Sequence, residues 1–386
     1  MKYNKKICFF STNRADLNYL SPIFIHFYKK NFFENYFVFN NSAKNLNFIK
    51  NENINKNKLI SYKFYFKGGT SKNIVNEISN FSKIVGSIFD KKLFDFIFII
   101  GDRYEANIIA TIANIYNIPI IHVHGGEITE GSYDDKFRHS ITKLSSIHFT
   151  SNEIYKNRVI QMGEQRKYVF CTGSPTIDLL KNFNFYEPSF LKKFFNINFN
   201  NRKILVSYNP VTNHNVSDKS FKNLLKVLSF YINDTSIFFS MANNDLMNTE
   251  INKQIKNFVK KNKKTKNTLF FNNVGSNIYL SLLKSVDIVI GNSSSGIIEA
   301  PYLNTLTINI GDRQKGRIID SSIINIDGSL KSINKSISEC LSNKKKFKLS
   351  NHYGTGKSII KMHKYMAKIS NLENLHIKKF NDINYK

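Results

Sequence analysis

The chain has 386 residues, 41% of them hydrophobic, and its formal net charge is +28. This length exceeds one ordinary hydrophobic core and indicates about two domains. The lysines are spread along the whole chain without a nucleic-acid-binding signature, so we favour solvated lysine-rich faces over nucleic-acid binding, and an anionic small ligand is a further explanation of the charge.

Cysteine usage and hydropathy limit the compartment. The three cysteines, Cys8, Cys171 and Cys340, form no Cys-x-x-Cys pair, which argues against both a disulfide framework and a zinc site. The apolar run at residues 7–10 is too short for a signal peptide, and no segment approaches the roughly 20 apolar residues of a membrane span. We therefore expect a cytoplasmic protein with no membrane partner, because free thiols persist in a reducing compartment.

The first half of the chain alternates predicted strands and helices. Residues 41–65 are polar and irregular and allow no clear prediction. Short apolar runs alternating with helical patterns of this length indicate a parallel, doubly wound sheet. The predicted strands lie at residues 6–10, 36–39, 94–100, 119–123, 147–150 and 169–171, and the predicted helices at 15–30, 73–89, 106–116 and 135–144.

The second half restarts the pattern, with strands predicted at residues 203–208, 236–240, 268–271, 287–290 and 306–310. Residues 182–202 contain Pro188 and no sheet pattern, and they are the predicted linker. We predict an α/β fold of two Rossmann-like domains, residues 1–181 and 202–356, that face a central cleft. Residues 357–386 are expected to form a helix, up to about residue 370, that returns to the first domain, and a charged tail that frays.

Chemically active side chains follow two strands of the first half. Asp102 and Arg103 come directly after one apolar run, and His122, His124 and Glu127 follow the next. In an open α/β sheet, ligands bind beyond the carboxyl ends of the strands, so both groups should face one crevice. Acids, imidazoles and guanidinium groups gathered there suit proton transfer on an anionic substrate. The following helix adds Asp134, Asp135, Arg138 and His139.

A second motif lies in the other half, where Asn292-Ser-Ser-Ser-Gly296 joins a predicted strand to a helix. Hydroxyls and free backbone N–H groups at a helix start form an anion site. A plain helix N-cap would need only one of the three serines, so the run favours phosphate binding. The stretch Asn309-Ile-Gly-Asp-Arg-Gln-Lys-Gly-Arg317 follows it.

Other cofactors are not indicated. The loop Ser11-Thr-Asn-Arg-Ala-Asp16 lacks the glycines of a dinucleotide site, and Gly354-Thr-Gly-Lys-Ser358 lacks the first glycine of a P-loop. Neighbouring positions of a strand point to opposite faces, so His122 should face the packing and His124 the cleft, and the two cannot easily share a metal. We expect neither a cofactor nor a metal.

The two long motifs resemble those of the hydrolysing UDP-N-acetylglucosamine 2-epimerases of the sialic acid and legionaminic acid pathways, and about residues 7–358 can be read against that family. The resemblance implies the glycosyltransferase-B architecture, a UDP-sugar substrate and a homo-oligomer (dimer or tetramer). It also implies catalytic roles for a group made up of Asp102, His124, Glu127, Asp134, Asp135, Arg138 and His139.

The UDP-sugar site that the resemblance implies draws on both halves. Ser293 and Ser294 would hold the diphosphate, Glu299 the ribose hydroxyls, and Val274 the uracil through its backbone. Further contacts are implied for Arg14, Asn18, Arg103, Asn209, Asn243, Ser295, Gly296 and Arg313.

One departure concerns Asn209-Pro-Val-Thr212, where the family usually has His-Pro-Val-Thr. Asparagine hydrogen-bonds but carries no proton at neutral pH. Either the histidine only binds substrate, or His214 replaces it, or activity is weakened.

The favoured function is inversion at C2 of a UDP-linked 2-acetamido sugar with loss of UDP. UDP-N-acetylglucosamine and UDP-N,N′-diacetylbacillosamine are both open as substrates. The family's non-hydrolysing members carry a catalytic glutamate at the position of His124, and His124-Gly-Gly-Glu127 is the hydrolysing arrangement. A non-hydrolysing 2-epimerase, a glycosyltransferase of the same architecture and a basic nucleic-acid-binding protein remain the alternatives.

Overall fold

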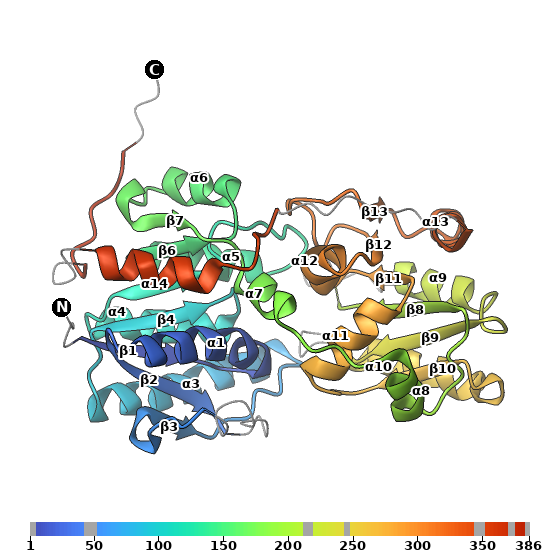
Figure 1. Cartoon of the computed structure of the whole chain (residues 1–386), viewed down its shortest axis with the longest axis horizontal. Helices are drawn as coiled ribbons and strands as arrows, with labels where there is room; N and C mark the ends of the chain where they lie inside the picture. The colour runs from blue at the N-terminus through green and yellow to red at the C-terminus, as the bar shows by residue number, and fades with distance from the viewer. Residues whose placement is uncertain are drawn as a thin grey trace.

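The computed structural model describes residues 5–41, 52–210, 219–242, 248–342, 352–369 and 375–382, without the side chains of residues 14, 15 and 248. Within these ranges the chain forms two lobes, each built on its own parallel sheet (Figure 1). Two residues considered above, Asn243 and His214, lie outside the described residues.

The first lobe holds a seven-stranded sheet in the order β3-β2-β1-β4-β5-β6-β7. Every neighbouring pair is parallel, so all carboxyl ends lie at one edge of the sheet. The strands are β1 (Lys6–Phe10), β2 (Glu34–Asn40), β3 (Leu59–Tyr62), β4 (Phe96–Ile100), β5 (Ile120–Val123), β6 (Ile147–Thr150) and β7 (Val169–Cys171).

Helices cover both faces of this sheet because its strands are apolar on both sides. On one face, Phe9 and Phe98 pack against α1 (Arg14–Lys30) and α14 (Ser358–Lys368). On the other face, Phe10 and Ile97 pack against α3 (Ser71–Lys91), α4 (Tyr104–Ile115) and α5 (Asp134–Leu144). The lobe also contains α6 (Glu153–Gln161), α7 (Pro175–Lys181) and the 3-10 turns η1 (Lys56–Lys58) and η2 (Arg166–Tyr168).

The second lobe repeats this plan with a parallel sheet in the order β10-β9-β8-β11-β12-β13. Its strands are β8 (Arg202–Ser207), β9 (Thr235–Ser240), β10 (Thr268–Phe271), β11 (Ile288–Gly291), β12 (Leu306–Ile310) and β13 (Ile323–Ile326).

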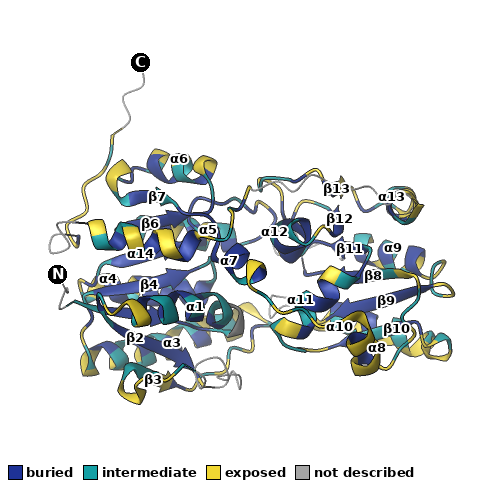
Figure 2. Cartoon of the chain, in the orientation of Figure 1, coloured by how far each residue is buried: buried dark blue, intermediate teal, exposed yellow. Residues whose placement is uncertain are grey.

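Two layers of helices enclose the second sheet. One face packs against α9 (Lys219–Leu228), α10 (Asn248–Lys261) and α13 (Leu330–Ser342). The other packs against α8 (Pro188–Phe195), α11 (Ser276–Ser285) and α12 (Ser295–Tyr302), and η3 (Lys263–Thr265) precedes β10. In both lobes the central strands are buried and the helices expose their outer faces (Figure 2).

The predicted linker is partly structured. Helix α8 lies inside residues 182–202, and its Leu191 and Phe195 pack in the core of the second lobe. The prediction missed it because eight residues give little helical periodicity.

The chain returns to the first lobe beside the place where it leaves. The backbone N–H of Ser174, just before α7, donates to the carbonyl of Tyr353 at 2.7 Å. Asp178 of α7 accepts hydrogen bonds from the backbone N–H groups of Ser358 and Ile359, and so caps the start of α14. The glycine-containing segment at residues 354–358 therefore belongs to this return crossing, and α14 packs on the first lobe as predicted.

The prediction that the tail frays is wrong for residues 375–382. Leu375 is buried in the first core, and the backbone N–H of Asn381 donates to the carbonyl of Gly163 at 2.8 Å. The ammonium of Lys378 lies 2.7 Å from the buried carboxylate of Glu164, which also binds Lys143 at 2.7 Å. The charged composition of the tail indicated that it would be solvated. The tail docks instead because the buried carboxylate of Glu164 pairs with Lys378.

Strand β3, at one edge of the first sheet, and strand β13, at one edge of the second, were not predicted, and neither was helix α6. Both strands are four residues long and only partly buried, so neither shows a clear apolar run.

Among the described residues, no helix has the length and apolar character needed to cross a membrane.

The ion pairs of Glu164 should make part of the free energy of unfolding depend on pH. Burial opposes its ionisation, but His148, Lys143 and Lys378 lower the pKa of Glu164 to about 2. A carboxylate whose pKa is lower in the folded state stabilises the fold at pH values above its unfolded-state pKa. This stabilisation is lost as the pH falls toward 2. Glu164→Gln should lower the free energy of unfolding by about 3 kcal/mol at pH 7.

Urea denaturation at pH 7, 5 and 3 measures this effect, and the difference from the unsubstituted protein should shrink as the pH falls. Glu339→Gln is the matched control, because its ion pair with Lys335 is exposed. That substitution should change the free energy of unfolding by less than about 0.5 kcal/mol. A Glu164→Gln effect that does not vary with pH would contradict the electrostatic explanation.

Candidate active site

The carboxyl ends of the two sheets face each other. The loop after β5, residues 124–133, meets the loop after β12, residues 311–317, where the backbone N–H of Glu130 donates to the carbonyl of Lys315 at 3.1 Å. A Cβ on Gly131 would lie 2.5 Å from Cα of Arg313, so the two lobes are in backbone contact here. Polar groups at the ends of several strands therefore converge at the junction of the lobes.

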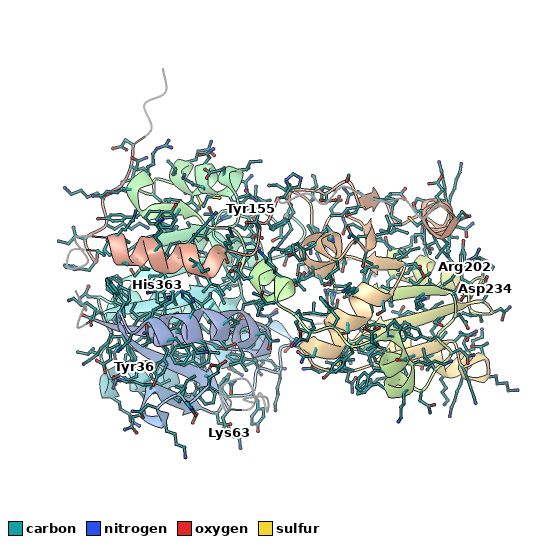
Figure 3. The ribbon with its side chains drawn as sticks, in the orientation of Figure 1. Tyr36, Lys63, Tyr155, Arg202, Asp234 and His363 are labelled. Atoms are coloured by element: carbon teal, nitrogen blue, oxygen red, sulfur yellow. The ribbon has the colours of Figure 1, made fainter. Side chains whose placement is uncertain are left out.

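The turn after β5 directs His124 away from the sheet. His124 has a φ of +72°, a conformation that is uncommon for a residue with a side chain, and Gly126 has a φ of +79°. Gly126 is required because a Cβ there would lie 2.4 Å from the carbonyl oxygen of Tyr155. Tyr155 lies at the junction of the lobes (Figure 3).

Glu127 lies at the centre of the first group of side chains. Its Oε1 lies 2.8 Å from Nδ1 of His124 and accepts a hydrogen bond from Ser151 at 3.2 Å. Its Oε2 lies 2.9 Å from Nη1 of Arg317, which comes from the other lobe. Burial opposes ionisation, but Arg317 and His124 outweigh it and hold the pKa of Glu127 well below its usual range. Nε2 of His124 lies 3.2 Å from the hydroxyl of Ser174.

Arg138 organises the second group. Its guanidinium is buried and donates to the carboxylates of Asp102 and Asp135, to the hydroxyl of Thr129 and to the backbone carbonyl of Glu127. Burial opposes ionisation of Asp102, but Arg138 outweighs it and lowers the pKa of Asp102. The side chain of Asp102 is 26% exposed and so remains open to a ligand.

Asp135 is occupied within the protein. Its carboxylate accepts the backbone N–H of Thr129 at 2.6 Å and lies 3.4 Å from Nε2 of His139. Burial opposes ionisation, whereas His139, Thr129 and Arg138 lower the pKa of Asp135 to about 2. Asp134 accepts a hydrogen bond from Ser132 at 3.0 Å.

The second lobe places the serine run at the start of α12. Ser294 is the residue before the helix, and its hydroxyl makes no capping hydrogen bond. The hydroxyl of Ser295 lies 2.7 Å from that of Tyr279 and 3.2 Å from that of Ser293. The serine that a plain N-cap would use is therefore left facing outward, as in an anion site.

Asn292 links the surrounding loops. Its side chain exchanges two hydrogen bonds with the backbone of Asn209, at 2.7 and 2.8 Å. Its carbonyl accepts Arg313 at 3.3 Å and Gln314 at 2.9 Å. The ends of β8, β11 and β12 are thereby held together.

Glu299 joins the two lobes from the first turns of α12. The hydroxyl of Tyr19, on α1, donates to its Oε1 at 3.0 Å. Its Oε2 is buried without a hydrogen-bond partner in the described part of the chain. Burial raises the pKa of Glu299. An unsatisfied carboxylate oxygen at this place suits an acceptor for a ligand hydroxyl.

The remaining predicted residues are placed less directly. Arg103 pairs with the buried Glu105 at 3.2 Å. Asn18 lies half-buried on α1, and Val274 lies in the turn between β10 and α11. Gly296 of α12 packs against Thr307 of β12. The backbone of Arg14 begins α1, but its side chain lies outside the described residues.

Three residues at the junction were missed by the sequence analysis: Arg317, Ser174 and Tyr19. Arg317 ends the second long motif, so its place in that motif was the available signal. Ser174 and Tyr19 are ordinary residues of a helix start and a helix, and nothing in the sequence marks them.

The prediction for His122 is confirmed. Its ring is fully buried and bonds the carbonyl of Gly101 at 2.9 Å and the hydroxyl of Thr142 at 3.2 Å. Burial is the main cause of its low pKa, about 3.

Within the part of the chain that the structure describes, no three His, Cys, Asp or Glu residues are grouped to hold a metal ion.

Comparison with known sequences gives consistent results. The sequence profile of the UDP-N-acetylglucosamine 2-epimerase family matches residues 53–367. The chain is 43% identical over 239 residues to a GDP/UDP-N,N′-diacetylbacillosamine 2-epimerase (hydrolysing) of Campylobacter jejuni, covering 60% of this chain but only 62% of that protein. It is 35% identical over 291 residues to polysialic acid biosynthesis protein P7 of Escherichia coli, covering 73% of this chain and 70% of that protein.

Solved structures share the fold. A protein of Listeria monocytogenes superposes with a TM-score of 0.78 at 15% identity, over 99% of this chain and all of that one. The UDP-GlcNAc 2-epimerase of Neisseria meningitidis bound to UDP-GlcNAc superposes with a TM-score of 0.76 at 16% identity, over 94% of this chain and all of that one. The two-lobed arrangement is therefore the glycosyltransferase-B fold.

We predict that a side chain at Gly131 would push the two lobes apart at their backbone contact. Gly131→Ala places a methyl group within 3 Å of the backbone of Arg313, so the lobes must move apart. Small-angle X-ray scattering should show a larger radius of gyration. Gly86→Ala is the control, because the nearest atom to its added Cβ is 3.8 Å away. Identical scattering for both variants would show that this contact does not limit closure.

Proposed function

Because residues 53–367 match its profile, the chain belongs to the UDP-N-acetylglucosamine 2-epimerase family, and we propose that it is a hydrolysing 2-epimerase. The substrate is a UDP-linked 2-acetamido sugar, and the products are UDP and the free mannosamine-type sugar. One observation supports the proposal: Arg317, from the loop after β12, pairs with the buried Glu127, and two other residues of that loop bind the carbonyl of Asn292, directly before the serine run of α12.

The second lobe binds UDP in this proposal. The exposed hydroxyl of Ser294 and the first N–H groups of α12 receive the diphosphate. The free oxygen of Glu299 accepts a ribose hydroxyl. Arg313 and Asn209 line the same side, and the backbone near Val274 contacts the uracil. Fixed donors aimed at the leaving diphosphate stabilise the negative charge that develops on it.

The first lobe carries out the proton transfers. A base removes the proton from C2, the electron pair forms the C1–C2 double bond, and the C1–O bond breaks so that UDP leaves. Water then adds to the resulting glycal: hydroxyl goes to C1, and a proton returns to C2 on the opposite face. Two proton-transfer groups must therefore flank the sugar.

Asp102 and His124 are the groups that we assign to these faces. Asp102 is partly exposed and held as a carboxylate by Arg138. His124 is oriented by Glu127 at Nδ1, and its Nε2, 3.2 Å from the hydroxyl of Ser174, is the nitrogen that exchanges the proton. Glu127 is 2% exposed and both its oxygens are engaged, so it acts through His124. Asp134, Asp135 and His139 support Arg138 and the loop that carries Glu127.

Two relatives differ in their stated substrates, and both substrates remain candidates here. The Campylobacter jejuni protein is a diacetylbacillosamine 2-epimerase, whereas the Neisseria meningitidis enzyme was solved with UDP-GlcNAc. We also propose the cytoplasm as the compartment, since all three cysteines are free, and a homo-oligomer, dimer or tetramer, as the assembly. The domain bounds 1–181, 202–356 and 357–386 remain our proposal.

The direct test of function is product analysis without an acceptor. Each UDP-sugar should yield UDP and a free 2-epimerised sugar, with one deuterium at C2 when the reaction runs in D₂O, as seen by NMR. Turnover should survive EDTA, because no three His, Cys, Asp or Glu side chains within the described ranges are grouped to hold a metal ion. An epimer still attached to UDP would indicate a non-hydrolysing enzyme. A strict need for an acceptor would indicate a glycosyltransferase.

Two substitutions separate binding from chemistry. Ser294→Ala removes an exposed donor and should weaken UDP binding by about 1–3 kcal/mol in calorimetry. Glu127→Gln keeps the shape but removes the charge that orients His124, and turnover should fall by about 10²–10⁴-fold with UDP binding unchanged. Near-normal turnover of Glu127→Gln would show that the proton-transfer group is assigned wrongly.

A further inference from the structure

Arg317 is the side chain through which the second lobe enters the acid–base group of the first. It comes from the loop after β12, yet its Nη1 lies 2.9 Å from Oε2 of Glu127. Both side chains are buried, at 6% and 2% exposed. Removing one partner of a buried ion pair is costly, because the other charge is left uncompensated.

The position of Arg317 depends on contact between the lobes. The neighbouring residue Gly316 packs against Ile128, where an added Cβ would lie 2.2 Å from the Ile128 side chain. On the other side, the backbone N–H of Ile318 donates to the hydroxyl of Tyr155 at 3.1 Å. Both partners belong to the first lobe. When the lobes separate, these contacts and the ion pair with Glu127 are lost together.

Arg317 also acts on the carboxylates around it. Its charge helps to lower the pKa of Asp102 and that of Glu127 in the first lobe, and it opposes the effect of burial on Glu299 in the second. Among the described residues, Arg317 is the arginine that forms an ion pair with Glu127. Its Nε and Nη1 are buried without a hydrogen-bond partner there, so Nη1 meets Glu127 as a close charge contact and not as an aligned hydrogen bond.

We propose that Arg317 is a positioning residue whose ion pair with Glu127 makes the acid–base group of the first lobe competent only when the two lobes are closed. The inference rests on the proposed function and adds to it the link between closure and proton transfer. In the open state Glu127 is hydrated and has no guanidinium partner. In the closed state Glu127 is a buried carboxylate held against His124, so proton transfer begins only around an enclosed substrate.

The matched control is a second ion pair between the same two loops. Lys315 lies 2.9 Å from Glu130, but these side chains are 61% and 51% exposed. Surface pairs of this kind contribute little. Lys315→Gln therefore removes a positive charge two residues away without disturbing the buried group, and Arg317→Lys keeps the charge but loses the planar guanidinium.

The experiment measures kcat and kcat/KM for UDP release against pH for the unsubstituted protein, Arg317→Gln, Arg317→Lys and Lys315→Gln. Arg317→Gln should lower kcat by on the order of 100-fold. It should also move the acid limb to higher pH by about one to three units, because the pair of Glu127 and His124 then holds its proton more tightly. Arg317→Lys should restore part of both effects, and Lys315→Gln should leave both unchanged.

Small-angle scattering with and without saturating UDP gives a readout that needs no turnover. Arg317→Gln should remain more open than Lys315→Gln when UDP is bound, with circular dichroism as the check on folding. An acid limb and a degree of closure equal to those of Lys315→Gln would overturn the inference. If the unsubstituted protein released no UDP from either sugar, the proposed function would fail, and scattering alone would decide the role of Arg317.

Discussion

Charge compensation between buried arginines and carboxylates is the constraint on which the junction of the lobes depends. Arg138 is 1% exposed and faces the partly exposed carboxylates of Asp102 and Asp135, whereas Arg317 is 6% exposed and faces the buried carboxylate of Glu127. Removing a charge from water costs several kcal/mol unless it is paired and hydrogen-bonded. The loops after β4, β5 and β12 are therefore arranged around these two guanidinium groups. Their carboxylates stay ionised near neutral pH, as a site for proton transfer requires.

The two lobes contribute different chemistry because of where their sheets end. Parallel strands bring Asp102, His124, Ser151 and Ser174 to one edge of the first sheet, while the second sheet presents Asn209 and the serine run. Acids close to a diphosphate would repel it, so separating them onto opposite lobes lets one cleft hold both kinds of group. In the proposed function, closure then brings the leaving group and the proton-transfer groups together around the bound substrate.

The crossing of the chain is tied to the site. Ser174 bonds His124 through its hydroxyl and the return crossing through its backbone N–H, which meets Tyr353. The hydroxyl of Tyr353 lies 3.4 Å from that of Tyr155, which in turn holds the loop of Arg317 through Ile318. These hydrogen bonds form one connected set from the hinge to both sides of the cleft. Helix α14, capped by Asp178, anchors the set on the first lobe.

The sequence by itself determined the regular elements and the grouping at the strand ends. Strands β1, β6, β10 and β12 were predicted at their observed bounds because each is a short apolar run with polar neighbours. Asp102 and Glu127 were expected together because the carboxyl ends of parallel strands meet at one edge, and the family resemblance added Arg138. Only the tertiary structure decided which charges pair. The contacts of Tyr19 with Glu299, of Arg317 with Glu127 and of Lys378 with Glu164 join residues far apart in the chain. They depend on how whole lobes and the tail dock, and local periodicity and composition carry no information about that docking.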